Sequence, residues 1–447
     1  MTAGTPSVPA PPAPSHAASQ RLFEEACRYI PGGSSRVHYF YEPFPIYAHH
    51  GAGCRLTDVD GVERLDFVNN MTSLIHGHAH PRILAAIADQ MQRGTAWSEP
   101  GAEEVRLAKH LVERVPSIER IRFGNSGTEN VMMAVKLARA FTGRHKIAKF
   151  EGFYHGYYDY IQVSVKSLPA NWGPEEEPAS TPNSGGLSPT VLDEVVTIPF
   201  NKPELLEALL AKHGRDLAAF LVDPLASQAG SPVPAPGFLD RLTELTRHYG
   251  IVLIYDEVVS FRLGYAGGQE RYGGQPDLTA LGKIIGGGLP VGAVGGRADI
   301  MALFDPTKGP PKVLSGGTFS ANPLTMAAGL AAMELYTRAE VERLNALGAR
   351  MRDGMNALFA ARGLPMCAGG DGSLVRILLM DEPVRDYRHF ATASGPAKRL
   401  AAIHAALMDD GIIVTRMGTA CLSTPMGESE VDQFVRALDR ALDRLPG

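Results

Sequence analysis

The central part of the chain alternates short apolar runs with amphipathic stretches. The apolar runs are RIRF (120–123), KIAKF (146–150), AAFLVD (218–223) and GIVLIYDE (250–257). Between them, segments such as NVMMAVKLARAFTG and FLDRLTELTRHYG carry apolar residues at helical spacing. Short apolar strands that alternate with helices are typical of βαβ units around a buried parallel sheet. We therefore predict an α/β fold, with a mostly parallel sheet flanked by helices, for a large domain over residues 81–325.

The two ends of the chain show a different pattern. After a predicted helix at 20–30, alternating runs on both sides of Asp60-Gly61 predict a β-hairpin. Beyond Pro323, a long helical stretch leads into a mixed C-terminal part. We expect residues 20–80 and 326–447 to pack together as a smaller α+β domain beside the large one.

Composition narrows the class of protein. A chain of 447 residues is too long for a single hydrophobic core, so two or more domains are expected. The net charge is −5 and the sequence has no basic face or polybasic run, so no nucleic-acid or membrane partner is expected. Residues 1–19, rich in Pro, Ala and Ser, are predicted to be a disordered leader and not a secretory signal. The four cysteines form no C-x-x-C pair, which fits a reducing compartment, and we expect a cytoplasmic protein.

A possible phosphate site follows the first apolar run. Asn125-Ser126-Gly127-Thr128-Glu129 lies between RIRF and a predicted helix. Small and hydroxyl residues at a strand-to-helix turn leave backbone N–H groups at the positive end of a helix, where a phosphate binds well. An ordinary N-cap explains the same residues, and the two interpretations are compatible.

Three further segments carry candidate chemistry. Asp256 ends a buried strand, where open α/β sheets bind ligands, and a protonated pyridine nitrogen, a metal ion or an internal salt bridge could balance its charge. Lys283 lies between apolar residues and a glycine run, and desolvation would make its amine nucleophilic. In Glu151-Gly-Phe-Tyr154-His155-Gly, the aromatic and imidazole rings could lie flat against a planar ligand, although a core aromatic at a turn is an alternative.

Taken together, NSGTE, KFEGFYHG, LIYDEVV, LGKIIGGGLP and GGTFSANP resemble the class III aminotransferases of fold type I. Within that family the chain is most similar to the branch of glutamate-1-semialdehyde aminomutases and β-amino-acid aminotransferases, over residues 20–440. The resemblance implies a fold type I transferase with pyridoxal 5'-phosphate as cofactor. It also implies two small-molecule substrates, an amino donor and a keto or aldehyde acceptor.

The resemblance assigns the reactive centre residue by residue. Lys283 would carry the cofactor as a Schiff base and later move the proton between substrate carbon and cofactor. Asp256 would pair with the pyridine nitrogen, and Val258 would lie behind the ring. Tyr154 would stack on the ring, with His155 beside it.

The remaining cofactor contacts are implied in the same way. Ser126, Gly127 and Thr128 would hold the phosphate. Gln228, in DPLASQAG, stands where relatives carry Asn or another small residue near the ring hydroxyl. Thr318, in GGTFSANP, resembles the threonine that reaches the phosphate of the neighbouring subunit, which implies a homodimer with its active site at the interface.

The candidate substrate contacts separate the branches. Arg36 and Met71 stand where aminomutases tend to carry serine and tryptophan, and an arginine offers a bidentate fork for a carboxylate. Both differences favour a transaminase that moves an amino group between a carboxylate-bearing amine, such as a β-amino acid, and a keto acid. Glu151 matches the aminomutase pattern, and Arg36 is equally explained as a surface or ion-paired arginine. Arg416 is a second candidate for a substrate acid group.

Two alternatives remain open, a glutamate-1-semialdehyde 2,1-aminomutase and a non-catalytic binding module. The presence of Lys283 and Asp256 weighs against the latter. His76, His78 and His80 have metal-chelating spacing, but the following proline favours a structural turn, so no metal site is predicted. The polar segment 165–190 is expected to be a functional or mobile loop.

Overall fold

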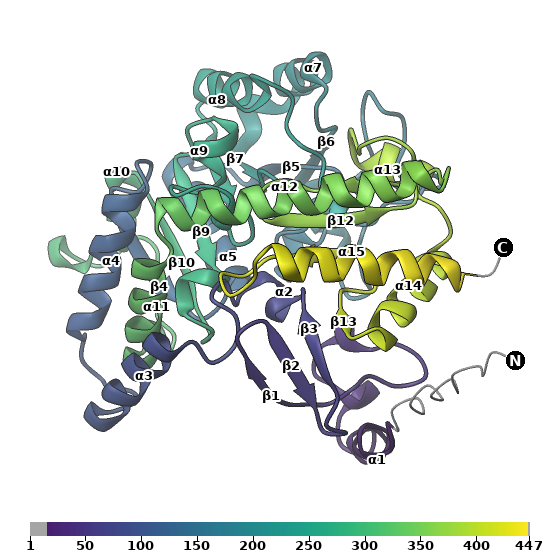
Figure 1. The fold of residues 1–447 in the computed structure, drawn as a ribbon. Helices are drawn as coiled ribbons and strands as arrows, with labels where there is room; N and C mark the ends of the chain where they lie inside the picture. Colours follow the sequence, from purple (N-terminus) through teal and green to yellow (C-terminus); the bar gives the residue numbers. More distant parts are fainter. Residues whose placement is uncertain (1–15, 446–447) are drawn as a thin grey trace, which may run out of the picture.

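A seven-stranded sheet forms the centre of the fold (Figure 1). In the computed structural model, which describes residues 16–445, its strand order is β4-β10-β9-β8-β7-β5-β6. The strands are β4 (Arg120–Gly124), β5 (Lys146–Phe150), β6 (Val195–Ile198), β7 (Leu217–Val222), β8 (Val252–Asp256), β9 (Leu278–Gly282) and β10 (Gly292–Gly296). Strand β10 is antiparallel to both of its neighbours, β4 and β9, and all other neighbouring strands of the sheet are parallel. The predicted α/β fold with a mostly parallel sheet is confirmed.

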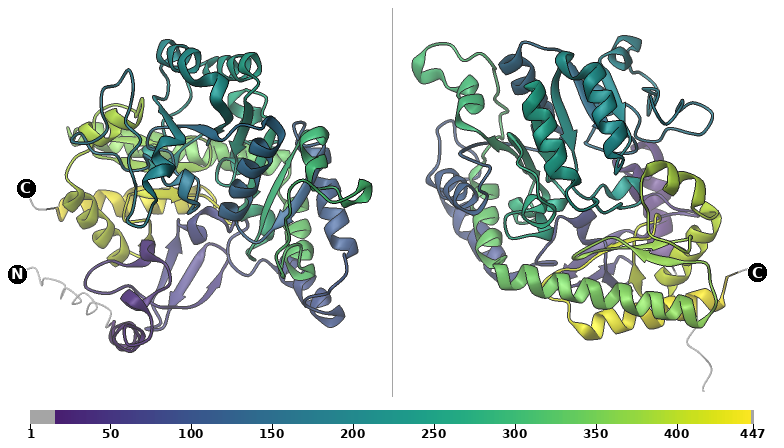
Figure 2. Two further views of the ribbon diagram at one scale, coloured as in Figure 1. Left: turned by 180° about the vertical axis from the view of Figure 1, so that it is seen from behind. Right: turned by 90° about the horizontal axis from the view of Figure 1, so that it is seen from above.

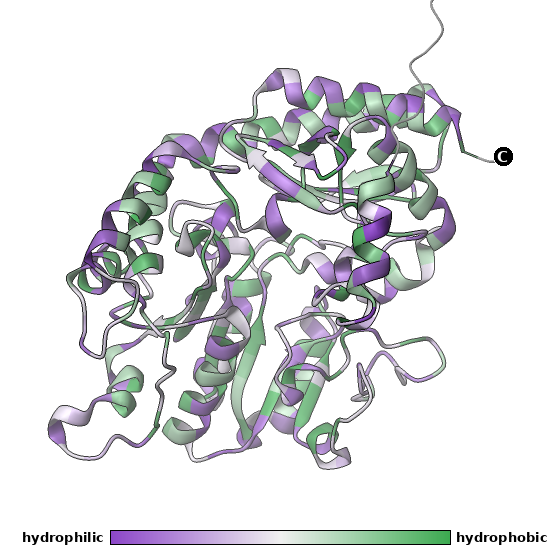
Figure 3. Cartoon of the chain, turned by 90° about the horizontal axis from the view of Figure 1, so that it is seen from below, coloured by the Kyte–Doolittle hydropathy of each residue, from purple (hydrophilic) through white to green (hydrophobic). Residues whose placement is uncertain are grey.

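Helices cover both faces of this sheet (Figure 2). Successive strand residues point to opposite faces. Leu221 and Ile254 accordingly pack with α5 (Gly127–Thr142), whereas Phe220 and Leu253 pack with α7 (Pro203–His213) and α8 (Phe238–Tyr249). Figure 3 shows the hydrophobic residues concentrated on the strands, and mixed hydropathy on the outer helices. The remaining helices of this part are α3 (Pro81–Arg93), α4 (Ala102–Arg114), α6 (Pro189–Asp193), α9 (Gly268–Tyr272), α10 (Ala298–Met301) and α11 (Pro323–Leu335).

The two ends of the chain meet in a second sheet. Strands β1 (Ala48–Ala52), β2 (Arg55–Asp58) and β3 (Glu63–Asp66) are antiparallel, and β13 (Ile412–Ile413) pairs in parallel with β3. A third sheet contains β11 (Cys367–Gly369), β12 (Leu374–Leu378) and β14 (Thr419–Cys421). The helices around them are α1 (Ala17–Ala26), α2 (Asn69–Thr72), α12 (Arg338–Ala361), α13 (Tyr387–Ala393), α14 (Ala397–Asp409) and α15 (Glu428–Asp443).

One apolar cluster joins the terminal segments to the central part. It runs from Leu107 and Ile285 to Phe67 and Phe434, all fully or nearly fully buried. The boundaries 20–80, 81–325 and 326–447 stay a prediction. None of the helices within residues 16–445 is long and apolar enough to cross a bilayer.

The first helix begins earlier than its local pattern indicates. Helix α1 starts at Ala17, inside the predicted leader, of which residues 1–15 lie outside the described residues. The carboxylate of Asp60 accepts hydrogen bonds from the backbone N–H of Ala18 at 2.7 Å and of Ser19 at 3.0 Å. A side chain distant in sequence therefore satisfies the N–H groups that a helix start leaves unpaired.

Candidate active site

Three strand ends bring acidic and basic side chains together. Asp223 follows β7, Asp256 ends β8 and Lys283 follows β9, and these strands are parallel neighbours. Burial lowers the pKa of the Lys283 amine, and the negative charges of Asp256 and Asp223 partly oppose that shift. Lys283 also has a positive φ of 50°, a conformation that costs energy for a side-chain-bearing residue. The result is a desolvated amine near two carboxyl groups, carried on a strained backbone, and a lowered amine pKa suits a nucleophile or proton carrier.

Asp256 is held in place by two hydrogen bonds. Its Oδ2 lies 2.9 Å from Nδ1 of His155, and its Oδ1 accepts from the backbone N–H of Val258 at 3.1 Å. Burial lowers the pKa of His155, and Asp256 opposes the shift. Nε2 of His155 is buried without a hydrogen-bond partner in the described part of the chain. Each Asp256 oxygen makes a single bond, so lone pairs remain for a cationic group of a ligand.

Asp223 was missed in the sequence analysis. Burial, and next the charge of Asp256, raise its pKa well above the usual range. The cause is that two buried carboxyl groups at one edge of a sheet do not both ionise easily. The signal that singled out Asp256, an acid at the end of a buried strand, was equally present in AAFLVD.

The predicted phosphate segment forms the start of α5. Ser126 Oγ accepts from the N–H of Glu129 at 3.1 Å, which confirms the N-cap. Gly127 packs so closely on Val258 that an added Cβ would lie 2.8 Å from its Cγ2. A Cβ on Gly156 would collide with Thr128 Oγ1. Loops after β4, β5 and β8 thus meet beside the free N–H groups of a helix start, where a phosphate fits.

The predicted ring contacts have different surroundings. Tyr154 is half-buried with its ring 5.7 Å from that of Tyr157, and burial raises the pKa of Tyr154, with Asp256 adding to the shift. Gln228 lies partly buried on a short turn, η5 (Ser227–Ala229), after β7. Both residues therefore follow strands whose carboxyl ends form the same edge as Asp256. Their contacts with a cofactor stay predictions.

Thr318 lies in an exposed loop. Its neighbours Leu314 and Phe319 are 76% and 58% exposed, although both are large and apolar. Asn125 Nδ2 lies 3.5 Å from Ser320 Oγ, so the loop runs beside the start of α5. The reach of Thr318 into a second subunit stays a prediction.

Arg36 stands near the reactive amine. Its Nη1 donates to Asn70 Oδ1 at 2.7 Å, and its positive charge adds to the lowering of the Lys283 pKa. Met71 is partly buried in the adjacent turn α2. Arg416 is further away in sequence and donates to the carbonyl of Phe40 at 2.9 Å. A segment near residue 36 and one near residue 70 therefore meet at the edge that holds Lys283.

Glu151 is paired inside the protein. Its buried carboxylate accepts from Nε of Arg388 at 2.7 Å, and Arg388 also donates to the carbonyls of Trp172 and Gly173 at 2.9 and 3.0 Å. Arg388 thereby connects Glu151 to the segment 165–190. A substrate contact of Glu151 stays a prediction.

We expect Arg388→Ala to destabilise the protein by about 3 kcal/mol, because it leaves a buried carboxylate unpaired. Burial raises the Glu151 pKa and Arg388 opposes this, so without the arginine the pKa rises further. A carboxyl whose folded pKa is raised loses stability as pH increases, so the deficit should grow above the usual glutamate range. Urea unfolding at several pH values measures this. The double variant Glu151→Gln with Arg388→Ala is the control, and an equally large, pH-dependent loss there would contradict the explanation.

Of the three histidines with metal-chelating spacing, His76 and His78 make hydrogen bonds inside the protein. His76 Nε2 lies 2.8 Å from the carbonyl of Ala332, and its Nδ1 lies 3.0 Å from Thr424 Oγ1. His78 Nε2 lies 2.8 Å from Asp66 Oδ2. These hydrogen bonds join the turn before α3 to the C-terminal segment and to β3.

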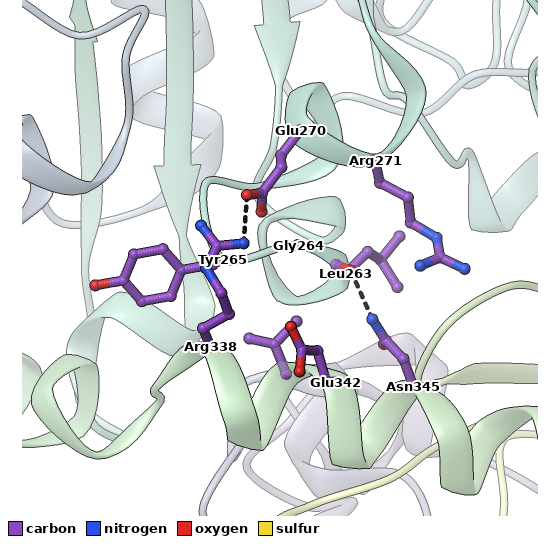
Figure 4. A pocket seen from close by; sticks show the side chains of 9 residues that line it. Leu263, Gly264, Tyr265, Glu270, Arg271, Arg338, Glu342 and Asn345 are labelled. Carbon is purple, nitrogen blue, oxygen red and sulfur yellow. Dashed lines mark hydrogen bonds and ion pairs between the residues drawn. The ribbon is translucent and has the colours of Figure 1, made fainter.

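A separate surface pocket lies between η6 (Ser260–Leu263), α9 and α12 (Figure 4). Arg338 Nη1 is 2.7 Å from Glu270, and Asn345 Nδ2 donates to the carbonyl of Leu263 at 2.8 Å. Two of its polar side chains are therefore engaged by neighbouring groups of the protein. None of the candidate residues lines this pocket.

The chain is similar in sequence and fold to known proteins over nearly its whole length. A family model described as aminotransferase class-III matches residues 38–442. A curated relative, the glutamate-1-semialdehyde 2,1-aminomutase of Sorangium cellulosum (strain So ce56), is 38% identical and covers 98% of this chain and 99% of its own. The solved omega-transaminase from Sphaerobacter thermophilus has a TM-score of 0.93 and 50% identity, and covers 95% of this chain and 97% of its own. The solved β-phenylalanine aminotransferase from Variovorax paradoxus has a TM-score of 0.86 and 36% identity, and covers 96% of this chain and 94% of its own.

Proposed function

The chain belongs to the class III aminotransferase family of pyridoxal-phosphate-dependent enzymes, and from this premise we propose that it transfers an amino group from a carboxylate-bearing amine, such as a β-amino acid, to a keto acid. One observation carries the choice of substrate. Arg36, a guanidinium without an ion pair within residues 16–445, lies close enough to Lys283 to lower the pKa of its amine. A carboxylate bound there would bring the substrate's amino group towards the reactive lysine.

The residues of the site fit pyridoxal phosphate. When bound, this cofactor supplies an electron-withdrawing ring that stabilises negative charge at the substrate carbon. Lys283 Nζ would hold its aldehyde carbon and Asp256 its ring nitrogen. The free lone pairs of Asp256 and the close packing of Gly127 on Val258, which no added Cβ would permit, support this arrangement.

The remaining assignments follow from the same edge of the sheet. The start of α5 would hold the phosphate, through Ser126, Gly127 and Thr128. Tyr154, His155 and Gln228 would surround the ring, because the segments that carry them follow β5 and β7, whose carboxyl ends lie at the same edge of the sheet as that of β8 with Asp256.

Lys283 would also move the proton. Its lowered pKa favours the neutral amine, which could accept a proton from the substrate carbon and deliver it to the carbon of the cofactor. His155 would fix the orientation of the Asp256 carboxyl group in the buried site. Arg36 would hold the substrate carboxylate and thereby select which face of the carbon is presented to Lys283.

A donor screen tests the proposal. We expect turnover of β-phenylalanine with a keto acid, and transfer of ¹⁵N from donor to acceptor. Arg36→Ala should raise KM for this donor about 10- to 100-fold, the usual range for losing a charge-assisted hydrogen bond. 1-Phenylpropylamine, which has a methyl group in place of the carboxylate, is the matched control donor. An equal loss with both donors would contradict a carboxylate contact.

An aminomutase is the second candidate. It is supported by the name of the Sorangium cellulosum relative and by Glu151, which matches the aminomutase pattern. Such an enzyme would rearrange glutamate-1-semialdehyde without a second substrate. Rapid single-substrate rearrangement, together with no ¹⁵N transfer from β-amino acids, would favour it over the transaminase.

We further propose that the enzyme is a homodimer in which Thr318 completes the partner's phosphate site. The exposed apolar side chains of Leu314 and Phe319, on the loop that runs beside Asn125, support an interface there. Leu314→Asp combined with Phe319→Asp should shift the sedimentation of the holoenzyme from dimer to monomer. Activity should fall in parallel, by at least about 10-fold, since charges buried without partners prevent association. An active monomer would overturn the shared site.

A further inference from the structure

Four consecutive residues next to the site form a left-handed turn. Asn69, Asn70, Met71 and Thr72 have φ values of 47°, 48°, 54° and 72°. Asparagine tolerates this conformation, whereas Met and the β-branched Thr rarely adopt it, and runs of several residues are unusual. Such a turn persists only where the surroundings hold it, and backbone strain of this kind gathers at functional sites.

The start of the turn is held by Asp66. Its Oδ1 accepts from the backbone N–H of Val68 at 2.7 Å and of Asn69 at 2.9 Å. The side chain of Asn69 is buried and donates to the carbonyl of Cys421 at 3.0 Å. These bonds fix the entry of the turn against the C-terminal segment.

The end of the turn is held by Arg262. This fully buried arginine donates to the carbonyl of Thr72 at 3.3 Å and to Ser373 Oγ at 2.9 Å. The left-handed backbone is thereby anchored on both sides to the interior. Only Asn70, at its centre, is exposed.

The anchored turn points one amide oxygen at Arg36. Asn70 Oδ1 accepts from Arg36 Nη1 at 2.7 Å and from Tyr39 Oη at 2.9 Å. Its Nδ2 donates to Ser73 Oγ at 3.0 Å, and that hydroxyl donates to the Asn70 carbonyl at 2.9 Å. Because Ser73 engages the nitrogen, the oxygen is directed towards the guanidinium.

Arg36 is oriented but not neutralised. The carbon of its guanidinium lies 4.2 Å from the centre of the Tyr39 ring, and its hydrogen-bond acceptor is an uncharged amide. An acidic residue at this position would form an ion pair and compete with an incoming anion. Neutral partners fix the direction of the fork and keep its charge for a ligand.

We propose that Asn70 is a positioning residue, which works with Tyr39 to aim the Arg36 guanidinium at the carboxylate of the substrate. This inference rests on the proposed role of Arg36 in substrate binding. It adds that a segment 34 residues away in sequence, in a strained backbone conformation, determines the direction of that contact.

Calorimetric titration of the holoenzyme with 3-phenylpropanoate tests the proposal. This probe has the carboxylate of β-phenylalanine but no amine, so binding requires no turnover. Asn70→Gly removes the amide while glycine accepts the positive φ, and it should weaken binding about 5- to 10-fold, less than Arg36→Ala, because the guanidinium remains and only its orientation is lost. Ser73→Ala, which removes the partner that turns the amide, should weaken binding in the same direction but by less than Asn70→Gly, because Tyr39 Oη still donates to the Asn70 oxygen.

A double-mutant cycle separates positioning from general damage. Adding Asn70→Gly to Arg36→Ala should weaken binding no further, because Asn70 acts through the arginine. Affinity for pyridoxal phosphate should stay the same in Asn70→Gly, whereas a disrupted site would lose it. Unchanged 3-phenylpropanoate binding in Asn70→Gly, an equal additional loss in the double variant, or no binding by the wild type would overturn the proposal. Failure of β-phenylalanine turnover, with the binding pattern intact, would instead contradict the proposed reaction alone.

Discussion

Replacing Lys283 with alanine is expected to reduce kcat by about 10⁴-fold, the upper range for removing a positioned proton-transfer group. The same change removes the amine that would carry the cofactor, so external amines should rescue little of the rate. The physical reason is the environment of Lys283. Burial lowers its pKa, and no other described lysine lies beside Asp223 and Asp256 at the strand ends.

Lys149 provides an internal control for this prediction. Lys149 is fully buried, and burial lowers its pKa to about 7, but its amine donates to the carbonyls of Phe150 and Val163 at 3.1 and 2.8 Å. Borohydride reduction of the holoenzyme, followed by peptide mass spectrometry, should therefore find the cofactor attached to Lys283. Attachment to Lys149, or retained activity in Lys283→Ala, would refute the assignment.

The second large effect is expected for Asp256→Asn, which should lower kcat by about 10²- to 10³-fold, as expected when one partner of a buried charge pair is lost. The variant keeps the shape of the side chain but not its negative charge. Without that charge a cationic ring nitrogen would lose its partner. The Lys283 pKa should fall further, because in the wild-type protein Asp256 opposes the lowering of that pKa by burial.

Asp223→Asn is the matched control. It changes a carboxyl group at the same edge of the sheet, but one whose pKa is raised by burial and by Asp256, so little negative charge is lost. We expect its kcat to fall less than about 10-fold, within the range of a single neutral hydrogen bond. Steady-state kinetics at saturating cofactor measure both variants. Equal losses would mean that Asp256 has no special electrostatic role.

Local sequence patterns were sufficient to predict the sheet and the strand ends that carry Asp256 and Lys283. Apolar runs interrupted by amphipathic stretches indicated β5, β7 and β8, and such local periodicity reflects which face of each element is buried. Asp256 and the start of α5 were found because strand ends and helix starts are local features. The antiparallel β10 was not, since its glycine-rich GAVGG has no such pattern.

Contacts between side chains that are distant in sequence could be identified only from the tertiary structure. Glu151 pairs with Arg388, 237 residues away, and Asp60 caps a helix 42 residues before it. The left-handed turn at Asn70 likewise depends on Arg262 and Asp66, which hold a backbone that its own residues disfavour. Propensity and periodicity act over a few neighbouring residues, whereas these contacts arise when separate segments pack. That packing also sets the direction of Arg36, on which the proposed choice of substrate depends.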